Sequence, residues 1–209
     1  MGKIYRYDAV TRASHWSHTF AMILLIITGL QIFTGLGFMD SFTVPFHVLL
    51  GWILLAALVM EVLNWILHPR EVLLSIPTPK DIKRWIIIAL NFMGLTDKYP
   101  AYHVYSKSRG EYITKWHPVL KFMIWGDLFF VLVIAFTGFA MYYPAGHPLA
   151  FLLNYLDMGT IRLLHFIAFI YFVLVMIPHG YLALQPVNRG VLKSMITGWD
   201  EGEDTVIVE

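Results

Sequence analysis

The amino-acid sequence predicts an all-α membrane protein built as a bundle of four transmembrane helices. Hydrophobic residues make up 58% of the 209 residues, charged residues only 14%, and the mean hydropathy is +0.64. These values lie far from those of an ordinary soluble domain. Four segments, at about 16–37, 44–67, 120–142 and 162–184, are apolar and long enough to cross the hydrocarbon core. We expect residues 1–209 to form a single integral-membrane domain.

The connection between the second and third spans contains a shorter amphipathic helix, at about 79–93. Thr78 can cap this helix, Pro79 fits its first turn, and Asp81 suits the positive end of its dipole. Basic residues at its start and an apolar stripe along one side predict a helix that lies on the membrane surface.

Basic residues cluster on one side of the predicted bundle. Three precede the first span and nine lie between residues 70 and 121, whereas the connections after the first and third spans have none apart from Arg162 at a helix entrance. The positive-inside rule therefore places both termini in the cytoplasm and Asp40 and Asp157 outside. We expect no cleaved signal peptide.

The fourth predicted span carries two histidines, His165 and His179, which are 14 residues apart. Fourteen residues are close to four helical turns, so the two imidazoles face the same way, about 21 Å apart along the axis. A polar side chain inside a bilayer is costly and usually functional, and neutral imidazole is a common axial ligand of haem iron. Two such ligands suggest two stacked haems.

Two further histidines match these two levels. His47 lies near the outer start of the second span, level with His165, and His15 lies at the inner mouth of the first span, level with His179. A single histidine in an apolar helix is more often a hydrogen-bonded core residue, but two depth-matched pairs favour iron ligation. His18, one turn after His15, could be the inner ligand instead.

The composition limits the kinds of redox centre that this chain can hold. The chain has no cysteine, which excludes disulfides, iron–sulfur clusters held by thiolates and the covalent attachment of c-type haem. A redox centre in this chain is therefore a haem held by histidine, or another cofactor bound without thiolates. The formal net charge of +1 argues against nucleic-acid binding.

Two glycines lie where a haem would need space. Gly29 follows His15 by 14 residues and shares its helix face at the level of the other haem, and Gly51 is one turn after His47. A missing side chain at these points would let a porphyrin lie against the backbone. Ordinary small-residue packing between membrane helices is the alternative explanation.

These residues carry a family resemblance. Residues 12–16, Arg-Ala-Ser-His-Trp, resemble the R-x-x-H-W opening of the four-helix cytochrome b subunits of membrane-bound formate dehydrogenase and nickel–iron hydrogenase. The stretch 164–183, followed by Gly190 and the run 195–199, is similar to the formate dehydrogenase gamma subunit. The resemblance covers nearly the whole chain.

The resemblance implies two haems b, each a protoporphyrin IX. The outer haem would be held by His47 and His165, and the inner haem by His15 and His179. It also implies a multi-pass protein of the cytoplasmic (inner) membrane of a prokaryote. The implied partners are an iron–sulfur electron-transfer subunit and a molybdenum, tungsten or nickel–iron catalytic subunit.

The family pattern changes at the entrance to the third span. Related chains often carry Y-N-x-x-Q-K beside a cytoplasmic quinone pocket, and here the run 116–121 reads Trp-His-Pro-Val-Leu-Lys. Lys121 is kept, whereas His117 replaces Asn and Leu120 replaces Gln. His117 can hydrogen-bond a quinone carbonyl and transfer a proton near neutral pH. Alternatively, His117 and Pro118 simply start a helix.

Two acidic residues lie within the spans, Glu61 toward the inner end of the second and Asp127 soon after the inner start of the third. Buried carboxylates of this kind often belong to proton routes. The alternative is that they form ion pairs with Lys121 or Arg84.

We therefore expect electrons to pass from an outer-face iron–sulfur partner through two haems to a quinone near His117. The chain would be the membrane anchor of a respiratory oxidoreductase similar to formate dehydrogenase, and another subunit would oxidise the substrate. The first alternative is the cytochrome subunit of a nickel–iron hydrogenase or of another molybdenum or tungsten oxidoreductase. A stand-alone quinol oxidoreductase similar to cytochrome b561 and a non-redox membrane module are further alternatives.

Overall fold

A computed structural model of the 209-residue chain describes residues 3–36, 40–201 and 205–208. The chain divides into two compact units. The helical unit consists of Ala9–Asn64 and Asp127–Gly180. The mixed unit consists of Met1–Asp8, Trp65–Gly126 and Tyr181–Glu209.

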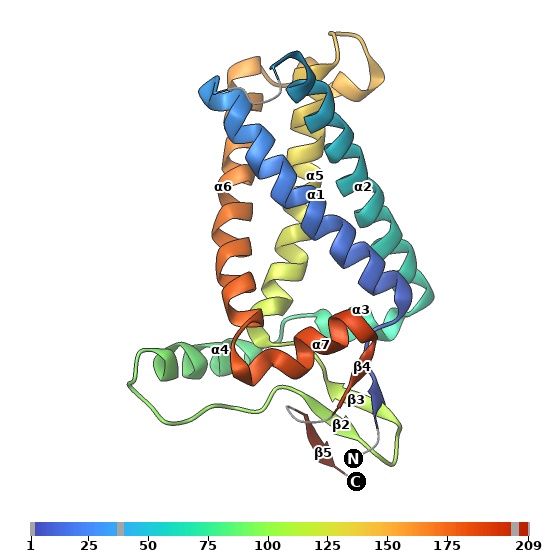
Figure 1. The fold of residues 1–209 in the computed structure, drawn as a ribbon, viewed down its shortest axis with the longest axis vertical. Helices are drawn as coiled ribbons and strands as arrows, with labels where there is room; N and C mark the ends of the chain where they lie inside the picture. The colour runs from blue at the N-terminus through green and yellow to red at the C-terminus, as the bar shows by residue number, and fades with distance from the viewer. Residues whose placement is uncertain (1–2, 37–39, 202–204, 209) are drawn as a thin grey trace. The chain divides into compact units, whose positions relative to one another are not determined.

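The helical unit is built from long helices that pass alongside one another (Figure 1). They are α1 (Ala9–Thr34), α2 (Thr43–Leu67), α5 (Pro118–Tyr142) and α6 (Met158–Ala183). Within the described part of the chain, these four helices are long and apolar enough to cross a membrane. The prediction of a four-helix membrane bundle is therefore confirmed.

The helices begin earlier than the apolar segments predict. Helix α1 starts at Ala9 rather than at residue 16, and α6 starts at Met158 rather than at 162. An apolar segment marks only the part of a helix suited to hydrocarbon, whereas the backbone hydrogen bonds continue into the polar turns beside it. The predicted end of the first span, Gly37, lies outside the described residues.

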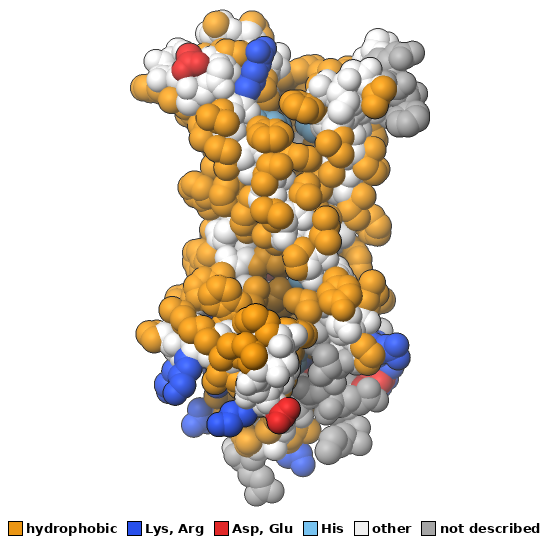
Figure 2. Space-filling model, turned by 90° about the vertical axis from the view of Figure 1, so that its left-hand side faces the viewer, with side chains coloured by type: hydrophobic (Ala, Val, Ile, Leu, Met, Phe, Trp, Pro, Cys, Tyr) orange, Lys and Arg blue, Asp and Glu red, His pale blue; other side chains and the backbone are white. Residues whose placement is uncertain are grey.

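The core of the helical unit combines side chains from all four helices. Met22 and Leu25 of α1, Leu54 of α2, Val131 of α5 and Phe172 of α6 are buried together. The outer surface of the long helices is also apolar, as the hydrophobic side chains in Figure 2 show. A bundle that is apolar both inside and outside is typical of a protein whose solvent is lipid.

The mixed unit contains short helices and strands. Its helices are α3 (Pro69–Ser75), α4 (Pro79–Phe92) and α7 (Arg189–Thr197), with a 3-10 turn η3 at Pro186–Asn188. Its strands are β1 (Ile4–Tyr5), β2 (Val104–Ser106), β3 (Glu111–Thr114), β4 (Trp199–Asp200) and β5 (Val206–Val208). Strand β1 pairs antiparallel with β4, while β2 pairs antiparallel with β3 and parallel with β5.

Helix α4 corresponds to the amphipathic helix that the sequence predicts. The backbone N–H of Thr78 donates to the carboxylate of Asp81 at 2.9 Å, as one half of a capping box at the start of the helix. The predicted apolar stripe includes Ile82 and Ile86, and both side chains are exposed. The location of α4 on the membrane surface stays a prediction.

A buried ion pair joins the two ends of the chain within the mixed unit. The guanidinium of Arg6 lies 2.8 Å from the carboxylate of Asp200, which also accepts hydrogen bonds from Tyr112 and Thr205. A second guanidinium nitrogen of Arg6 donates to the carbonyl of Lys115. Both charges are almost fully buried, and they are tolerated because each has several partners.

Candidate functional site

The outer histidine pair consists of His47 on α2 and His165 on α6. Their ring centroids are 6.4 Å apart, with 55° between the ring planes. This separation is too large for a direct hydrogen bond between the ring nitrogens to hold the pair together. The two residues that the sequence placed at one level therefore lie next to each other in the bundle.

The inner pair consists of His15 on α1 and His179 on α6, with ring centroids 6.2 Å apart and 64° between the planes. The ring of His18 instead packs edge-on against Phe172, at a centroid distance of 6.3 Å. Of the two residues considered for the inner level, His15 is thus the one whose ring faces His179. Its role as a ligand remains a prediction.

Both distances would accommodate one iron atom bound by both rings. A metal–nitrogen bond of about 2.0 Å on each side, with roughly 1.2 Å from nitrogen to ring centre, would separate the ring centres by up to about 6.4 Å. Among the described residues, no group of three His, Asp or Glu side chains is arranged to hold a bare metal ion. A haem needs only two protein ligands because the porphyrin supplies the other four. The paired histidines therefore fit a haem.

The start of α1, which carries His15, is tied to α2. The hydroxyl of Ser14 donates to the carbonyl of Ala57 at 3.0 Å, and the side-chain amide of Asn64 donates to the hydroxyl of Thr11 at 2.9 Å. The Nδ1 atom of His15 is buried and has no hydrogen-bond partner among the described residues.

The outer pair has partners that the sequence analysis missed. The hydroxyl of Thr28 on α1 lies 2.7 Å from Nδ1 of His47, and the hydroxyl of Thr137 on α5 lies 2.9 Å from Nδ1 of His165. Metal-ligating histidines usually hold their second ring nitrogen in such a hydrogen bond. No sequence signal pointed to these threonines, because contacts between helices depend on how the helices are rotated.

The predicted glycines behave differently from each other. A Cβ atom on Gly29 would lie 3.4 Å from Cε1 of His47, so Gly29 does lie at the level of the outer pair. A Cβ atom on Gly51 would meet nothing within 4 Å, so open space adjoins this position. A Cβ atom on Gly138, which the sequence analysis did not single out, would lie still closer to a candidate ligand, at 3.3 Å from Cε1 of His165.

The carboxylate of Asp127 on α5 accepts a hydrogen bond of 2.9 Å from the hydroxyl of Tyr171 on α6. The Tyr171 ring in turn stacks on Phe130, with centroids 4.0 Å apart. One carboxylate oxygen of Glu61 on α2 is buried. The structure thus gives Asp127 a neutral partner, and a proton route through either carboxylate remains a prediction.

The basic residues considered as partners of those carboxylates both pair with Asp81. The ammonium of Lys121 lies 2.9 Å from Asp81, and the guanidinium of Arg84 lies 3.7 Å from it. Both ion pairs lie in the mixed unit. Lys121 and Arg84 therefore share Asp81 as a partner, and pairing of either residue with Glu61 or Asp127 stays a prediction.

His117 immediately precedes α5 and acts as its cap. Its Nδ1 accepts a hydrogen bond of 3.2 Å from the backbone N–H of Val119, and its ring packs edge-on against Tyr102 at a centroid distance of 4.5 Å. Burial lowers the pKa of His117 to about 4. The imidazole is therefore neutral at pH 7, with its hydrogen on Nε2. It can donate a hydrogen bond there, but it is poorly matched to proton transfer near neutral pH.

The other residues of the proposed quinone motif have different surroundings. Lys121 donates to the carbonyl of Ile76 at 3.4 Å in addition to its pairing with Asp81, so structural partners already engage it. The indole Nε1 of Trp116 is buried and has no hydrogen-bond partner within the described ranges. Trp116, next to His117, is a second donor that the sequence analysis did not consider.

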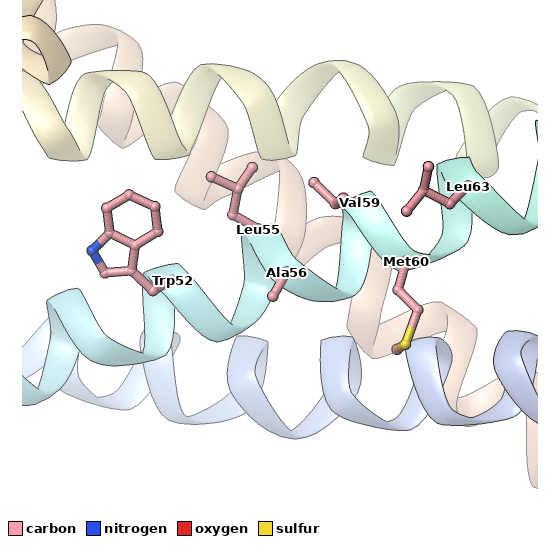
Figure 3. Close-up of a pocket in the computed structure, with 6 residues that line it drawn as sticks. All are labelled: Trp52, Leu55, Ala56, Val59, Met60 and Leu63. Atoms are coloured by element: carbon pink, nitrogen blue, oxygen red, sulfur yellow. The ribbon is translucent and has the colours of Figure 1, made fainter.

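Side chains of helix α2 also line an apolar hollow (Figure 3). Six apolar or weakly polar side chains line it: Trp52, Leu55, Ala56, Val59, Met60 and Leu63. Such a surface suits a lipid chain or another apolar group.

Comparison with known proteins decides the family. The family model described as "Prokaryotic cytochrome b561" matches residues 6–198 of the chain. The chain belongs to the prokaryotic cytochrome b561 family. The match covers all four long helices and both histidine pairs.

A curated relative supports the same assignment. The chain is 33% identical over 154 residues to the F420 non-reducing hydrogenase II cytochrome subunit of Methanosarcina mazei. The alignment covers 66% of this chain and 55% of the relative, so the chain spans little more than half the length of that protein.

Membership of the family confirms part of what the sequence predicted. The chain is a multi-pass prokaryotic membrane protein of a family whose cofactor is haem b, and it resembles the b-type cytochrome subunits of hydrogenases. The number of haems, their ligands and the orientation of the chain in the membrane stay predictions.

Proposed function

We propose that this chain is the di-haem membrane subunit of a hydrogenase-type respiratory complex and carries electrons across the membrane to a quinone. The observation that carries this proposal is the presence of two facing histidine pairs, at 6.2 Å and 6.4 Å, in one apolar bundle. The hydrogenase cytochrome subunit from Methanosarcina mazei supports hydrogenase as the partner enzyme.

In this proposal His47 and His165 hold one haem, and His15 and His179 hold the other. Bound haem b supplies reversible one-electron chemistry at its iron. The protein would hold the two histidine pairs at separate levels, and core residues such as Phe172 would exclude water between those levels. The chain itself has no cysteine for an iron–sulfur cluster, so in this proposal the cluster that delivers the electrons belongs to a partner subunit.

The direction of transfer follows from the proposed orientation. The basic connection between residues 70 and 121 favours a cytoplasmic location for the mixed unit, and the connection 144–160, which has no basic residue, would face outward. An iron–sulfur subunit bound outside, together with a nickel–iron catalytic subunit, would deliver electrons to the outer haem. Each electron that crosses inward would conserve roughly 2.3 kcal/mol per 100 mV of membrane potential.

At the cytoplasmic end, His117 would donate a hydrogen bond to a quinone carbonyl. Its Nδ1 is occupied by the Val119 N–H, which leaves the Nε2 hydrogen for a ligand. Protons would come from water through carboxylates such as Asp127 and Glu61 rather than from the neutral His117. Lys121 would support this site indirectly, by anchoring α4 through Asp81.

A formate dehydrogenase gamma-like subunit, with a molybdenum or tungsten partner enzyme, is the second candidate. The similarity of the stretch 164–183, Gly190 and the run 195–199 to that subunit favours it. A stand-alone quinol oxidoreductase would need no partner enzyme.

The donor can be identified with the native complex in its membranes. Under anaerobic conditions, we expect hydrogen to reduce the b haems and an added quinone analogue to reoxidise them, as followed by the α-band absorbance. Reduction by formate but not by hydrogen would select the second candidate. Reduction by quinol alone, with no co-purifying iron–sulfur polypeptide, would contradict both.

A further inference from the structure

The two outer histidines share a local arrangement that the inner pair does not show. Each has Nδ1 against a threonine hydroxyl of a neighbouring helix, and the next residue of that helix is glycine. The dipeptides are Thr28-Gly29 on α1, against His47, and Thr137-Gly138 on α5, against His165. We call each dipeptide a seat.

The hydroxyl groups have a defined direction. Thr28 donates its single hydrogen to the carbonyl of Leu24 at 2.7 Å, and Thr137 donates to the carbonyl of Val133 at 2.6 Å. A hydroxyl has one hydrogen and two lone pairs, so each oxygen is left to accept from the imidazole. The network therefore assigns the hydrogen to Nδ1 in both histidines and leaves Nε2 unprotonated, the state that a metal ligand requires.

The glycines provide the space for this contact. A Cβ atom on Gly29 would lie 3.4 Å from Cε1 of His47, and one on Gly138 would lie 3.3 Å from Cε1 of His165. Each imidazole edge thus lies almost against the backbone of the neighbouring helix. A longer side chain at either position would push the ring away from the threonine and rotate it.

The inner level lacks the equivalent bond at one ligand. Nδ1 of His15 has no partner among the described residues. The hydroxyl of Thr19, on the same helix, donates instead to the backbone carbonyl of His15 at 2.8 Å. Both candidate ligands of the outer level therefore have an Nδ1 hydrogen bond to a threonine, whereas His15 of the inner level does not.

We propose that the two Thr-Gly seats are positioning elements for the outer haem, which orient His47 and His165 and set the reduction potential of the iron that they hold. The inference rests on the proposed ligation of a haem by these two histidines. A hydrogen bond from Nδ1 raises the basicity of an imidazole ligand, which stabilises ferric over ferrous iron. Loss of a seat hydroxyl therefore raises the potential of the outer haem and leaves that of the inner haem unchanged.

The test uses T28V and T137V, which keep the β-branched shape but remove the hydroxyl. Potentiometric titration should show an upward shift of one haem midpoint, and low-temperature EPR should show a changed g value for the same ferric haem. T28S and T137S, which restore the hydroxyl, should return both values toward those of the unmodified protein. T34V is the matched control, because the Thr34 hydroxyl makes the same bond to its own helix, to the Leu30 carbonyl, and has no hydrogen bond to a histidine within the described ranges.

The haem affected must be the one lost in His47→Ala. Unchanged potentials and g values in both valine variants, with full haem content, would overturn the proposal, and so would a shift of the other haem. If a valine variant loses the outer haem while its serine counterpart keeps it, the proposal is supported. Full haem content in His47→Ala would instead refute the proposed ligand set, independently of the threonines.

Discussion

The imidazole of His15 faces that of His179 at a centroid distance of 6.2 Å, although the two residues come from the first and last of the long helices. Their helices are held in place by apolar packing and by hydrogen bonds such as the one from Ser14 to Ala57. The distance would allow both imidazoles to bind one iron. This relationship distinguishes His15 from its neighbour His18.

Replacement of His15 should remove the inner haem, whereas replacement of His18 should not. His15→Ala takes away one of two iron ligands, while His18→Ala removes only a ring that packs against Phe172. We expect His15→Ala to lose half of the bound haem, as measured by the pyridine haemochrome assay on protein of known concentration. Retention of all haem in His15→Ala, with loss in His18→Ala, would reverse the assignment.

Removal of Lys121 should destabilise the protein rather than act first on quinone chemistry. The Lys121–Asp81 pair is almost fully buried, and removal of one partner of such a pair typically costs about 3–5 kcal/mol. We expect K121M and D81L each to lower the thermal unfolding midpoint in detergent, and the double variant to lower it by less than the sum. A stable K121M with slow quinone reduction would show a direct role for the ammonium.

Replacement of His117 should slow reoxidation of the haems by quinone without loss of haem. His117→Leu removes both the cap to Val119 and the Nε2 donor, whereas His117→Asn can keep a cap acceptor and a donor. We expect the Asn variant to stay within about a factor of two of the unmodified rate and the Leu variant to be at least roughly tenfold slower.

The pH dependence separates hydrogen bonding from proton transfer at His117. Because burial lowers its pKa to about 4, the group stays neutral as the pH rises from 6 to 8 and does not titrate in that range. The rate ratio between the unmodified protein and His117→Asn should therefore be constant over this range. A ratio that changes as a single group titrates would establish the imidazole as a proton carrier.

A proton route through Asp127 requires its carboxyl group and not the neighbouring phenol. Asp127→Asn removes the exchangeable carboxyl proton, while Tyr171→Phe removes only the hydroxyl that donates to it and keeps the ring stacked on Phe130. We expect Asp127→Asn to slow quinone reduction several-fold and Tyr171→Phe to change it little, in stopped-flow measurements with haem content checked. Normal turnover in Asp127→Asn would exclude the route.

The sequence predicted the features that depend on one helix at a time. The four spans follow from apolar length, and the two levels follow from the 14-residue spacing of His165 and His179 on one helix face. Contacts between helices were not predictable in the same way. The Thr28–His47 and Thr137–His165 bonds join residues 19 and 28 positions apart, and they depend on helix rotations that no single-helix pattern fixes.

The polar part of the chain was the least predictable. Strands such as β1 (Ile4–Tyr5) are only two residues long, so they leave no alternating pattern to detect. The pairing of Lys121 with Asp81 joins residues 40 positions apart and could not be told from pairing with an acidic residue of the spans. The family resemblance placed Lys121 in the quinone motif, whereas in the structure its ammonium pairs with Asp81.

The number of haems tests the central claim most directly. The account requires two haems b for each chain, one between His15 and His179 and one between His47 and His165. Iron and pyridine haemochrome analysis of the purified chain, set against its concentration from amino-acid analysis, should give a ratio of two, falling to one in His47→Ala. A ratio of one or zero in the unmodified protein would contradict the account.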